Sequence, residues 1–570
     1  MTRNMNIWLE HMVKDSWISE YPTGSMYEAI EETAKKVPNK VALDFEGAKI
    51  KYKDLIKGIN KTAQSMKKLG VGEGDVVSII SPNFPQALFS FYATNRLGAT
   101  ANMMHPMLSI QEIKESIEKT KTKVIVILDQ IYPKIASIKW EGIEKPTIVL
   151  IRVVDALPAY AKPVYTMQNR KKKPTIKVNG NIIVYWNEFL ANGVGVELPP
   201  ADNDKDRVAV IMSSGGTTGK PKGVMLTNYN FNSLYVQSMD ICGEYYNVNM
   251  KWSSLGLVPI FHGFGLGICI HSMLGLGFCI YLVPVFDFNK SIKLIFKKKI
   301  NCIYAVPALF EALSRSTQIE TEDVSFIKML ISGGDKISVE LQKRINSYME
   351  KKGSDVRVRE AFGQTESVCG GTINPRFDIR IGSVGIAYPD NEIKVVKLGT
   401  IEEAPLGEEG ELCIFGPTVM KGYFDNEEAT AQVLKKHDDG KVWLHTGDVF
   451  TMDKDGYAYY KRRINRMIIC AGYNIYLNEV EEIIQSCPCV SVCCAVGRED
   501  KVVGKRLEVY VELNNPNADI DECKEVIRKK CEENLAQHSI PSKINVVKEI
   551  PRTPVGKIDY VLISKEGVKC

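Results

Sequence analysis

The sequence predicts an α/β fold, with a large N-terminal part built on doubly wound sheets, a small β-rich region and a small α+β C-terminal domain. Two observations lead to this prediction. Short apolar segments followed by helical runs recur before about residue 380, which is typical of doubly wound sheets. Alternating apolar and polar residues with turn signals then take over, and mixed charged helices and short strands fill the last part.

The recurring units begin with the strand VVSIISPN at 76–83, which precedes a helical run at 85–98. Further short apolar strands are expected at 124–129, 208–213, 302–306 and 327–334. Ligands of such sheets bind at the carboxyl ends of the strands. The loops SSGGTTG, FHGFG and ISGGD all follow predicted strands, so we expect them to face one cleft.

The stretch from Trp252 to Phe286 contains no charged side chain and is long enough to suggest a membrane span. Pro259, Pro284, two histidines and several glycines interrupt it. We therefore interpret it as a strand, a turn, a helix and a second strand, buried within a parallel sheet. No transmembrane span is expected.

The β-rich region is predicted at about 380–460, where the segments at 381–397, 408–416 and 441–461 alternate. The basic segment KRRINRM at 461–467 separates the two patterns. The expected domains are therefore 1–460 and 461–570. A chain of 570 residues is too long for a single core, which supports a division of this kind.

The charge balance gives no reason to expect a nucleic-acid partner, because 73 basic and 68 acidic residues leave a net charge of only +5. The opening residues contain no apolar signal segment, and the 14 cysteines are therefore expected to be free thiols in a reducing cytoplasm. The cluster SCPCVSVCCAV has no CxxC pair. A buried strand that uses cysteine as a small apolar residue fits it better than a zinc site.

The segment VAVIMSSGGTTGKPKG at 208–223 predicts a phosphate-binding loop. Its glycines let backbone N–H groups converge on an anion, and its hydroxyls and lysines add donors and charge. The spacing does not fit a Walker A loop, because Ser214 stands where the first glycine is needed and Pro221 follows Lys220. A flexible surface loop is the alternative interpretation.

Seven motifs in order extend this prediction: SSGGTTGKPKG, HGFG, FGQTE, GELCIFG, TGD, RRINRMIICAGYNIYLNEVE and PRTPVGKID. Together they resemble the adenylate-forming superfamily of acyl-CoA synthetases, peptide-synthetase adenylation domains and firefly-type luciferases. The resemblance spans nearly the whole chain. It implies that a carboxylate attacks the α-phosphate of MgATP to give acyl-adenylate and pyrophosphate, and that a thiol, commonly coenzyme A, then displaces AMP. It also implies a mobile C-terminal domain.

The resemblance assigns roles to individual residues. The phosphate loop would bind the β- and γ-phosphates, Thr365 would donate to the α-phosphate, and Glu366 would hold Mg²⁺ as a hard oxygen ligand. Lys557 would reach the α-phosphate during adenylation, and His262 with Phe264 would line the acyl site. The residues of the phosphate loop are Ser213, Ser214, Gly215, Gly216, Thr217, Thr218, Gly219 and Lys220.

Adenine would lie against Gly333, Gly334 and Phe362, whose ring could stack on the base; Gly363 and Gln364 continue this loop. Core packing is the alternative for Phe362, as an ordinary buried histidine is for His262. Asp335 could receive the adenine amino group or cap the helix that follows it.

Asp448 would accept both ribose hydroxyls, and Arg463 would contact the ribose or phosphate. A turn aspartate and a surface arginine are the alternatives. Two positions depart from the family pattern: Arg462 stands where aspartate is frequent, and Ile469 where many CoA ligases carry lysine. Asn465 falls at the expected hinge.

The sequence therefore predicts an AMP-forming acyl-CoA ligase that uses ATP, Mg²⁺ and coenzyme A. The apolar lining implied by FHGFGLGICI favours a fatty or aromatic carboxylic acid as the substrate. An enzyme that loads a separate carrier protein is one alternative. A non-catalytic acyl or nucleotide binder is another.

Overall fold

The computed structural model describes residues 20–168, 176, 182–214, 222–242, 247–285, 287–464, 467–470, 473–500, 504–553 and 558–568. The chain divides into two compact units. Of the described residues, those within 20–214, 222–393 and 414–444 form one unit, and those within 394–413 and 445–568 form the other.

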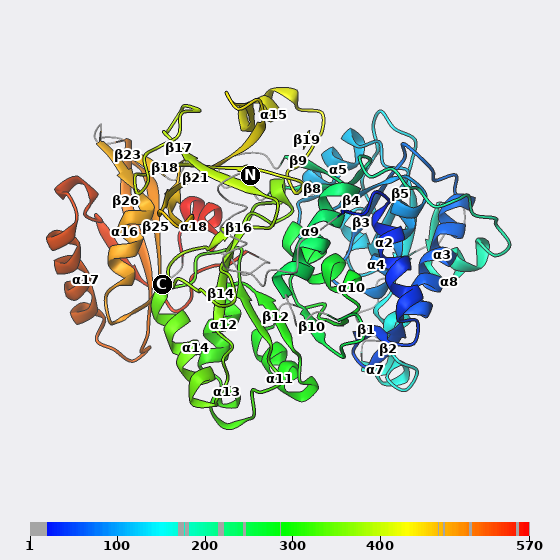
Figure 1. The fold of residues 1–570 in the computed structure, drawn as a ribbon, viewed down its shortest axis with the longest axis horizontal. Helices are drawn as coiled ribbons and strands as arrows, with labels where there is room; N and C mark the ends of the chain where they lie inside the picture. Colours follow the sequence, from blue (N-terminus) through cyan, green and yellow to red (C-terminus); the bar gives the residue numbers. More distant parts are fainter. Residues whose placement is uncertain are drawn as a thin grey trace. The chain divides into compact units, whose positions relative to one another are not determined.

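Two large sheets form the first unit (Figure 1). The nine-stranded sheet has the order β16-β15-β14-β13-β12-β10-β11-β1-β2, and the eight-stranded sheet has the order β19-β9-β8-β4-β3-β5-β6-β7. Both are parallel at the centre; the nine-stranded sheet has antiparallel strands at both edges, and the eight-stranded sheet has them at the edge formed by β9 and β19. The sequence-based expectation of doubly wound sheets is confirmed.

The strands of the nine-stranded sheet are β1 Val41–Phe45, β2 Ala48–Lys51, β10 Ser253–Gly256, β11 Cys279–Leu282, β12 Cys302–Ala305, β13 Met329–Ser332, β14 Val358–Phe362, β15 Thr372–Ile373 and β16 Ile386–Ala387. Those of the eight-stranded sheet are β3 Val76–Ile80, β4 Thr100–Met103, β5 Val124–Leu128, β6 Thr147–Ile151, β7 Ile183–Tyr185, β8 Val208–Ser213, β9 Gly223–Thr227 and β19 Gly422–Tyr423.

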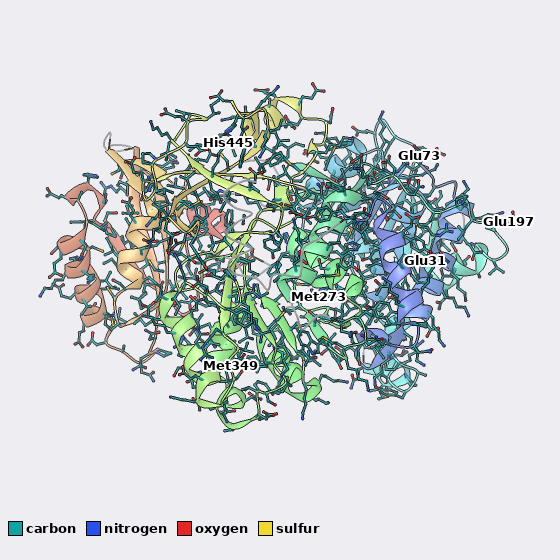
Figure 2. The ribbon with its side chains drawn as sticks, in the orientation of Figure 1. Glu31, Glu73, Glu197, Met273, Met349 and His445 are labelled. Atoms are coloured by element: carbon teal, nitrogen blue, oxygen red, sulfur yellow. The ribbon has the colours of Figure 1, made fainter. Side chains whose placement is uncertain are left out.

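Amphipathic helices cover one face of the nine-stranded sheet. The helices α11 (Phe288–Lys298), α12 (Pro307–Ser314) and α14 (Val339–Lys351) share a buried apolar cluster with β10, β12, β13 and β14. Met349 of α14, labelled in Figure 2, is fully buried in this cluster. Ser338 begins α14, and its Oγ accepts a hydrogen bond from Leu341 N at 3.2 Å. This is the usual way in which a serine satisfies the free donors of a first turn.

Further helices pack on the eight-stranded sheet, on the β1–β2 edge of the nine-stranded sheet or against one another. They are α2 Met26–Lys36, α3 Tyr52–Lys68, α4 Pro85–Arg96, α5 Ile110–Lys119 and α9 Asn228–Cys242. The side chains of Ile113 and Ile117 on α5 pack with isoleucines of β5 and β6 in a separate apolar cluster.

The charge-free stretch has the predicted strand–helix–strand order. Strands β10 and β11 pair in parallel, and a π-helix at Phe264–Ser272 continues into α10 (Met273–Gly275) between them. The strand β10 is shorter than expected, because the chain turns at Gly256 to form a loop. In the described part of the chain, no helix is long and apolar enough to cross a membrane.

Another sheet lies in the second unit, in the order β24-β23-β26-β25 with β27 beside β26. Its strands are β23 Met467–Cys470, β24 Tyr473–Tyr476, β25 Val490–Asp500, β26 Gly504–Leu513 and β27 Lys543–Val546. The helices of this part of the chain are α16 Leu477–Gln485, α17 Ile520–Asn534 and α18 Tyr560–Glu566. Cys493 and Cys494 lie in β25 and are buried, as expected for cysteines that act as small apolar residues. Cys487 is also buried, but it lies before the strand.

Candidate active site

The two ends of the predicted phosphate loop are held together by a β-hairpin. Ser213 ends β8, and β9 runs back beside it in antiparallel register with Ser213 opposite Gly223. The backbone N–H of Ser214 donates to the carbonyl of Lys222 at 2.8 Å. A Walker A loop leads from a strand into a helix, whereas this loop leads into a strand. The remaining predicted members, residues 215–220, lie outside the described residues.

Glu366 lies just after β14, in the 3-10 turn Thr365–Ser367, and contacts the edge of the other sheet. Its Oε1 accepts a hydrogen bond from the hydroxyl of Tyr423 at 2.8 Å, and its carbonyl accepts one from Met420 N at 2.8 Å. The Nζ of Lys222 lies 4.8 Å from the centroid of the Tyr423 ring. Tyr423 therefore connects the base of the phosphate loop to the predicted metal ligand.

The turn that carries Thr365 and Glu366 is followed by two residues with a strained backbone. Val368 and Cys369 both have positive φ, at 48° and 60°. This region is costly for any residue with a side chain and most of all for a β-branched one. The N–H of Cys369 donates to the carbonyl of Gln364 at 2.8 Å, which closes the turn. A Cβ on Gly363 would lie 2.3 Å from the backbone of Cys369, so only glycine permits this approach.

The predicted adenine residues gather at the ends of β13 and β14. A Cβ on Gly333 would lie 3.5 Å from the carbonyl O of Ala361 and 3.7 Å from the ring of Phe264. Gly334 has a φ of +82°, which favours glycine. Phe362, at the end of β14, is only half-buried, so it is not packed inside the hydrophobic core.

Asp335 is exposed, and its Oδ1 accepts a hydrogen bond from the N–H of Lys336 at 2.9 Å. The alternative prediction, that Asp335 caps the following helix, is wrong. Ser338 caps α14 instead, because its Oγ accepts the hydrogen bond from Leu341 N in the first turn.

Glu360 is a buried carboxyl group beneath this loop that sequence reasoning missed. It retains 2% of its accessible surface, and its Oε1 accepts a hydrogen bond from Ile337 N at 3.2 Å. Burial raises the pKa of Glu360 to about 8. The only signal in the sequence is an acidic residue within an otherwise strand-like segment, VREAF.

His262 lies in an aromatic group at the turn after β10. The rings of Phe261 and His262 are 5.1 Å apart, and the ring of His105 lies 4.3 Å from that of Phe261. Burial, with the nearby charge of Lys134, lowers the pKa of His105 to about 4, so its ring is neutral at neutral pH. His105 was not predicted as a site residue, although it follows the buried strand β4.

Asn83 anchors the loop that leads to His262. Its side-chain amide donates to the carbonyls of Gly256 at 2.9 Å and Val258 at 3.1 Å, and its Oδ1 accepts from Ile260 N at 2.9 Å. Asn83 follows β3 of the eight-stranded sheet, whereas Gly256 ends β10 of the nine-stranded one. One amide group therefore joins the two sheets beside the predicted acyl site.

The π-helix beyond His262 depends on two glycines. A Cβ on Gly265 would lie 2.0 Å from the carbonyl O of Pro259, and one on Gly267 would lie 2.8 Å from Cγ1 of Val368. The π-helix thus packs directly against the strained turn that follows Glu366. π-Helices are rare in proteins, and those that do form are often found at functional sites.

Asp448 and Arg463 lie opposite one another in the second unit, on β21 (Val442–Met452) and β22 (Ala458–Arg463). Arg463 Nε is 3.7 Å from Asp448 Oδ1, and the Asp448 side chain is almost fully buried. Asp448 therefore belongs to a strand and not to a turn. Arg462, the adjacent departure from the family pattern, forms an ion pair with Glu409.

Glu411 holds the segment before Asp448 in place. Its Oε1 accepts a hydrogen bond from Gly447 N at 2.8 Å, and its Oε2 lies 2.7 Å from Nδ1 of His445.

Ile469 pairs with Asn474 between β23 and β24. Lys557 and Asn465 lie outside the described residues.

Comparison with protein families gives two matches along this chain. Residues 30–424 match the AMP-binding enzyme family, and residues 479–557 match the AMP-binding enzyme C-terminal domain. Together these segments cover most of the sequence.

Similar proteins have been named as acid–CoA ligases. A long-chain-fatty-acid–CoA ligase of Bacillus subtilis is 30% identical over 561 residues, which cover 95% of this chain and 96% of that protein. A probable 4-coumarate–CoA ligase 1 of Dictyostelium discoideum is 30% identical over 442 residues, or 77% of this chain and 76% of that protein. The solved structure of the o-succinylbenzoate coenzyme A synthetase of Bacillus subtilis, in complex with ATP and magnesium ion, has a similar fold, with a TM-score of 0.71. That similarity covers 94% of this chain and 98% of the other at 24% identity.

Proposed function

This chain belongs to the AMP-binding enzyme family, and on that basis we propose that it is an AMP-forming acid–CoA ligase. It activates a carboxylic acid with MgATP as an acyl-adenylate, releases pyrophosphate and transfers the acyl group to coenzyme A. The observation that supports this most strongly is the connection from Lys222 through Tyr423 to Glu366. It brings the base of the phosphate loop next to a carboxylate suited to a hard cation.

The residues of the first unit fit ATP and Mg²⁺. A carboxylate oxygen is the ligand type that Mg²⁺ prefers, and the hydrogen bond from Tyr423 orients that carboxylate. Bound Mg²⁺ would supply charge stabilisation to the phosphates. Thr365 would donate to the α-phosphate, and Phe362 would stack on adenine above Gly333 and Gly334.

Each remaining residue has one role in the proposal. Asp448 would accept the ribose hydroxyls, Arg463 would contact the ribose or phosphate, and Lys557 would stabilise charge on the α-phosphate during adenylation. His262 would line the site of the reacting carboxylate. The segment Ser213 to Lys220 would hold the pyrophosphate that leaves.

The proposed boundary between an N-terminal domain and a mobile C-terminal domain lies at residues 460 and 461. This boundary places Lys557 and Asn465 on the C-terminal domain, so that a rotation could bring Lys557 to the site for one half-reaction only.

The acid substrate is proposed to carry a fatty or aromatic group. Phe261 and Phe264 beside His262 offer an apolar surface. Relatives named for long-chain fatty acids and for 4-coumarate support both types.

Two alternatives lead to different results in the same assay. An enzyme that loads a carrier protein would release pyrophosphate but form no thioester with coenzyme A, and Ile469 in place of a lysine is the observation that favours it. A non-catalytic binder would release none, but the presence of Thr365, Glu366 and Asp448 argues against it.

A panel of carboxylic acids tests the proposal. The protein is incubated with MgATP, coenzyme A and each acid, pyrophosphate is measured, and the acyl product is identified by mass spectrometry. We expect pyrophosphate and an acyl-CoA with at least one fatty or aromatic acid. Pyrophosphate without any acyl-CoA would shift the assignment to the carrier-loading enzyme.

A further inference from the structure

Arg359 lies in the middle of β14 and is nearly completely buried, with 5% of its surface accessible. Successive side chains on a strand point to opposite faces of its sheet. Val358 belongs to the apolar cluster with α14, and Glu360 contacts Ile337 just before that helix. Arg359 and Ala361 therefore face the other side of the sheet.

Within the part of the chain that the structure describes, the guanidinium of Arg359 makes one hydrogen bond, from Nε to the carbonyl O of Asn374 at 2.6 Å. Among the described residues, no carboxylate lies within 4.0 Å of its nitrogen atoms. Arg376 differs, because its Nη2 lies 3.5 Å from Asp355 Oδ2. A buried charge without an opposite charge is strongly unfavourable, so a side chain of this kind calls for an external partner.

The groups around Arg359 that could become anions stay neutral. They are Tyr304, Tyr388 and Cys242, and burial raises the pKa of each of them above its ordinary value. The nearby guanidinium of Arg376 adds further positive charge. Arginine itself keeps its proton at any physiological pH. The environment of Arg359 is therefore positively charged and apolar.

The place of Arg359 on the strand relates it to the reacting end of the substrate. Ala361, two residues further on, approaches Gly333, which in turn lies beside Phe264 of the proposed acyl site. Two residues of a strand span about 7 Å. Tyr304 points to the same side of the sheet, because its neighbours Ile303 and Ala305 belong to the apolar cluster on the other face. Arg359 thus lies about 7 Å further than Ala361 from the loops at the strand ends.

We propose that Arg359 binds a second anionic oxygen group at the far end of the acid substrate, which makes this enzyme selective for dicarboxylic acids with an apolar middle. This inference rests on the proposed ligase function and refines its substrate. The first carboxylate reacts with ATP near Thr365 and His262, the apolar middle passes Phe264 and Ala361, and the second carboxylate pairs with Arg359. Arg359 acts as a specificity residue and takes no part in the bond-forming steps.

The test compares acids that differ only at the far end. Hexanoate is paired with adipate, octanoate with suberate and benzoate with terephthalate, and ATP–pyrophosphate exchange gives kcat/KM for each. The wild-type protein is expected to favour at least one dicarboxylic acid over its partner by about ten- to a hundredfold, as expected for a charged hydrogen-bonded pair. Arg359→Met should abolish or reverse that preference, and Arg359→Lys should retain part of it.

Arg357→Met is the matched control, because Arg357 lies next to the same strand but pairs with Glu350 at 3.5 Å. It should leave the ratio of the two acids unchanged. Thermal unfolding checks that each variant is folded. If Arg359→Met does not fold, the ratio in the wild-type protein and in Arg359→Lys decides the question.

The outcomes separate the inference from the function on which it rests. Exchange with equal or greater preference for the monocarboxylic acids in the wild-type protein would overturn the inference alone. An unchanged ratio in folded Arg359→Met would do the same. Absence of exchange with every acid would overturn the ligase function and this inference with it.

Discussion

The hydroxyl of Tyr423 donates a 2.8 Å hydrogen bond to Oε1 of Glu366, although the two residues lie 57 positions apart. Tyr423 belongs to β19 at the edge of the eight-stranded sheet, and Glu366 follows β14 of the nine-stranded one. This bond joins the two sheets at the point where the metal ion is proposed to bind. It also leaves the carboxylate with a defined direction before any ligand arrives.

Tyr423→Phe should weaken adenylation without unfolding the protein. The variant loses one hydrogen bond to a charged group, worth about 1.5–3 kcal/mol, so ATP–pyrophosphate exchange should fall roughly ten- to a hundredfold. The variant should also need more Mg²⁺ for half-maximal exchange. Tyr459→Phe, which removes a 3.0 Å bond to Asp453, is the control and should leave the Mg²⁺ requirement unchanged. An unaltered Mg²⁺ requirement in Tyr423→Phe would contradict the orienting role.

Glu366→Ala should remove most adenylation while the fold stays intact. The loss of a metal ligand is expected to cost several kcal/mol of transition-state stabilisation, which is on the order of a thousandfold or more in rate. Pyrophosphate exchange and thermal unfolding are measured on the same sample. Exchange close to the wild-type rate in a folded variant would remove Glu366 from the metal site.

Asp448→Asn should weaken the binding of ATP, because the ribose hydroxyls lose a charged acceptor worth roughly 1.5–3 kcal/mol. Titration calorimetry with ATP measures the change in Kd. Asp425→Asn serves as the control, since Asp425 is exposed and its carboxylate forms a 3.7 Å surface ion pair with Lys119. Unchanged affinity in Asp448→Asn would show that its buried carboxylate serves the strand pair alone.

Lys557→Ala and Asn465→Pro should separate the two half-reactions. Without Lys557, adenylate should not form, but an adenylate supplied ready-made should still react with coenzyme A. Proline at position 465 would fix φ near −65° and block the hinge, so exchange should persist while thioester formation falls. Pyrophosphate exchange and thioester formation from supplied adenylate are measured separately. Equal loss of both in Asn465→Pro would place the hinge elsewhere.

Glu360→Gln should stabilise the protein at alkaline pH. Burial raises the pKa of Glu360 from its usual 4.5 to about 8, so between these values the folded protein holds a proton that the unfolded chain releases. Stability from this group therefore falls as the pH rises through that window. Glutamine cannot ionise and keeps the oxygen that accepts from Ile337 N, so the gain should grow to a few kcal/mol at the upper end.

The free energy of unfolding in urea, measured across that pH range, checks this prediction. Glu340→Gln is the control, because Glu340 is exposed in the first turn of α14. It should shift the unfolding free energy little and equally at each pH. A pH-independent effect of Glu360→Gln would contradict the burial of an ionisable carboxyl.

Much of the fold could be predicted from local patterns in the sequence. Each of the predicted apolar segments 76–83, 124–129 and 208–213 contains a strand of the structure. They could be recognised because strands that are buried on both faces form continuous apolar runs. The charge-free stretch could be divided correctly, because its prolines and glycines mark the turns. The π-helix within it could not be predicted, since no local pattern distinguishes it from an α-helix.

The parts of the site that depend on distant pairing could not be predicted. Tyr423 contacts Glu366 only because β19 pairs with β9, and those strands are almost two hundred residues apart. The same holds for Asn83, whose partners lie beyond residue 250. The raised pKa of Glu360 and the lack of a carboxylate beside Arg359 among the described residues depend on the side chains packed around them. Those neighbours come from distant parts of the chain and cannot be read from the local sequence.

The close approach of Gly267 to Val368 constrains how this protein can evolve. A methyl group at 267 would lie 2.8 Å from Cγ1 of Val368, and Val368 itself occupies a φ that favours glycine. A smaller residue at 368 would remove the shortest contact of a larger residue at 267, and the Cδ2 of Leu234, 3.0 Å from the added methyl group, would have to shift slightly. Substitutions at these two positions should therefore be inherited as a pair, so that natural variants with alanine at 267 carry glycine or alanine at 368.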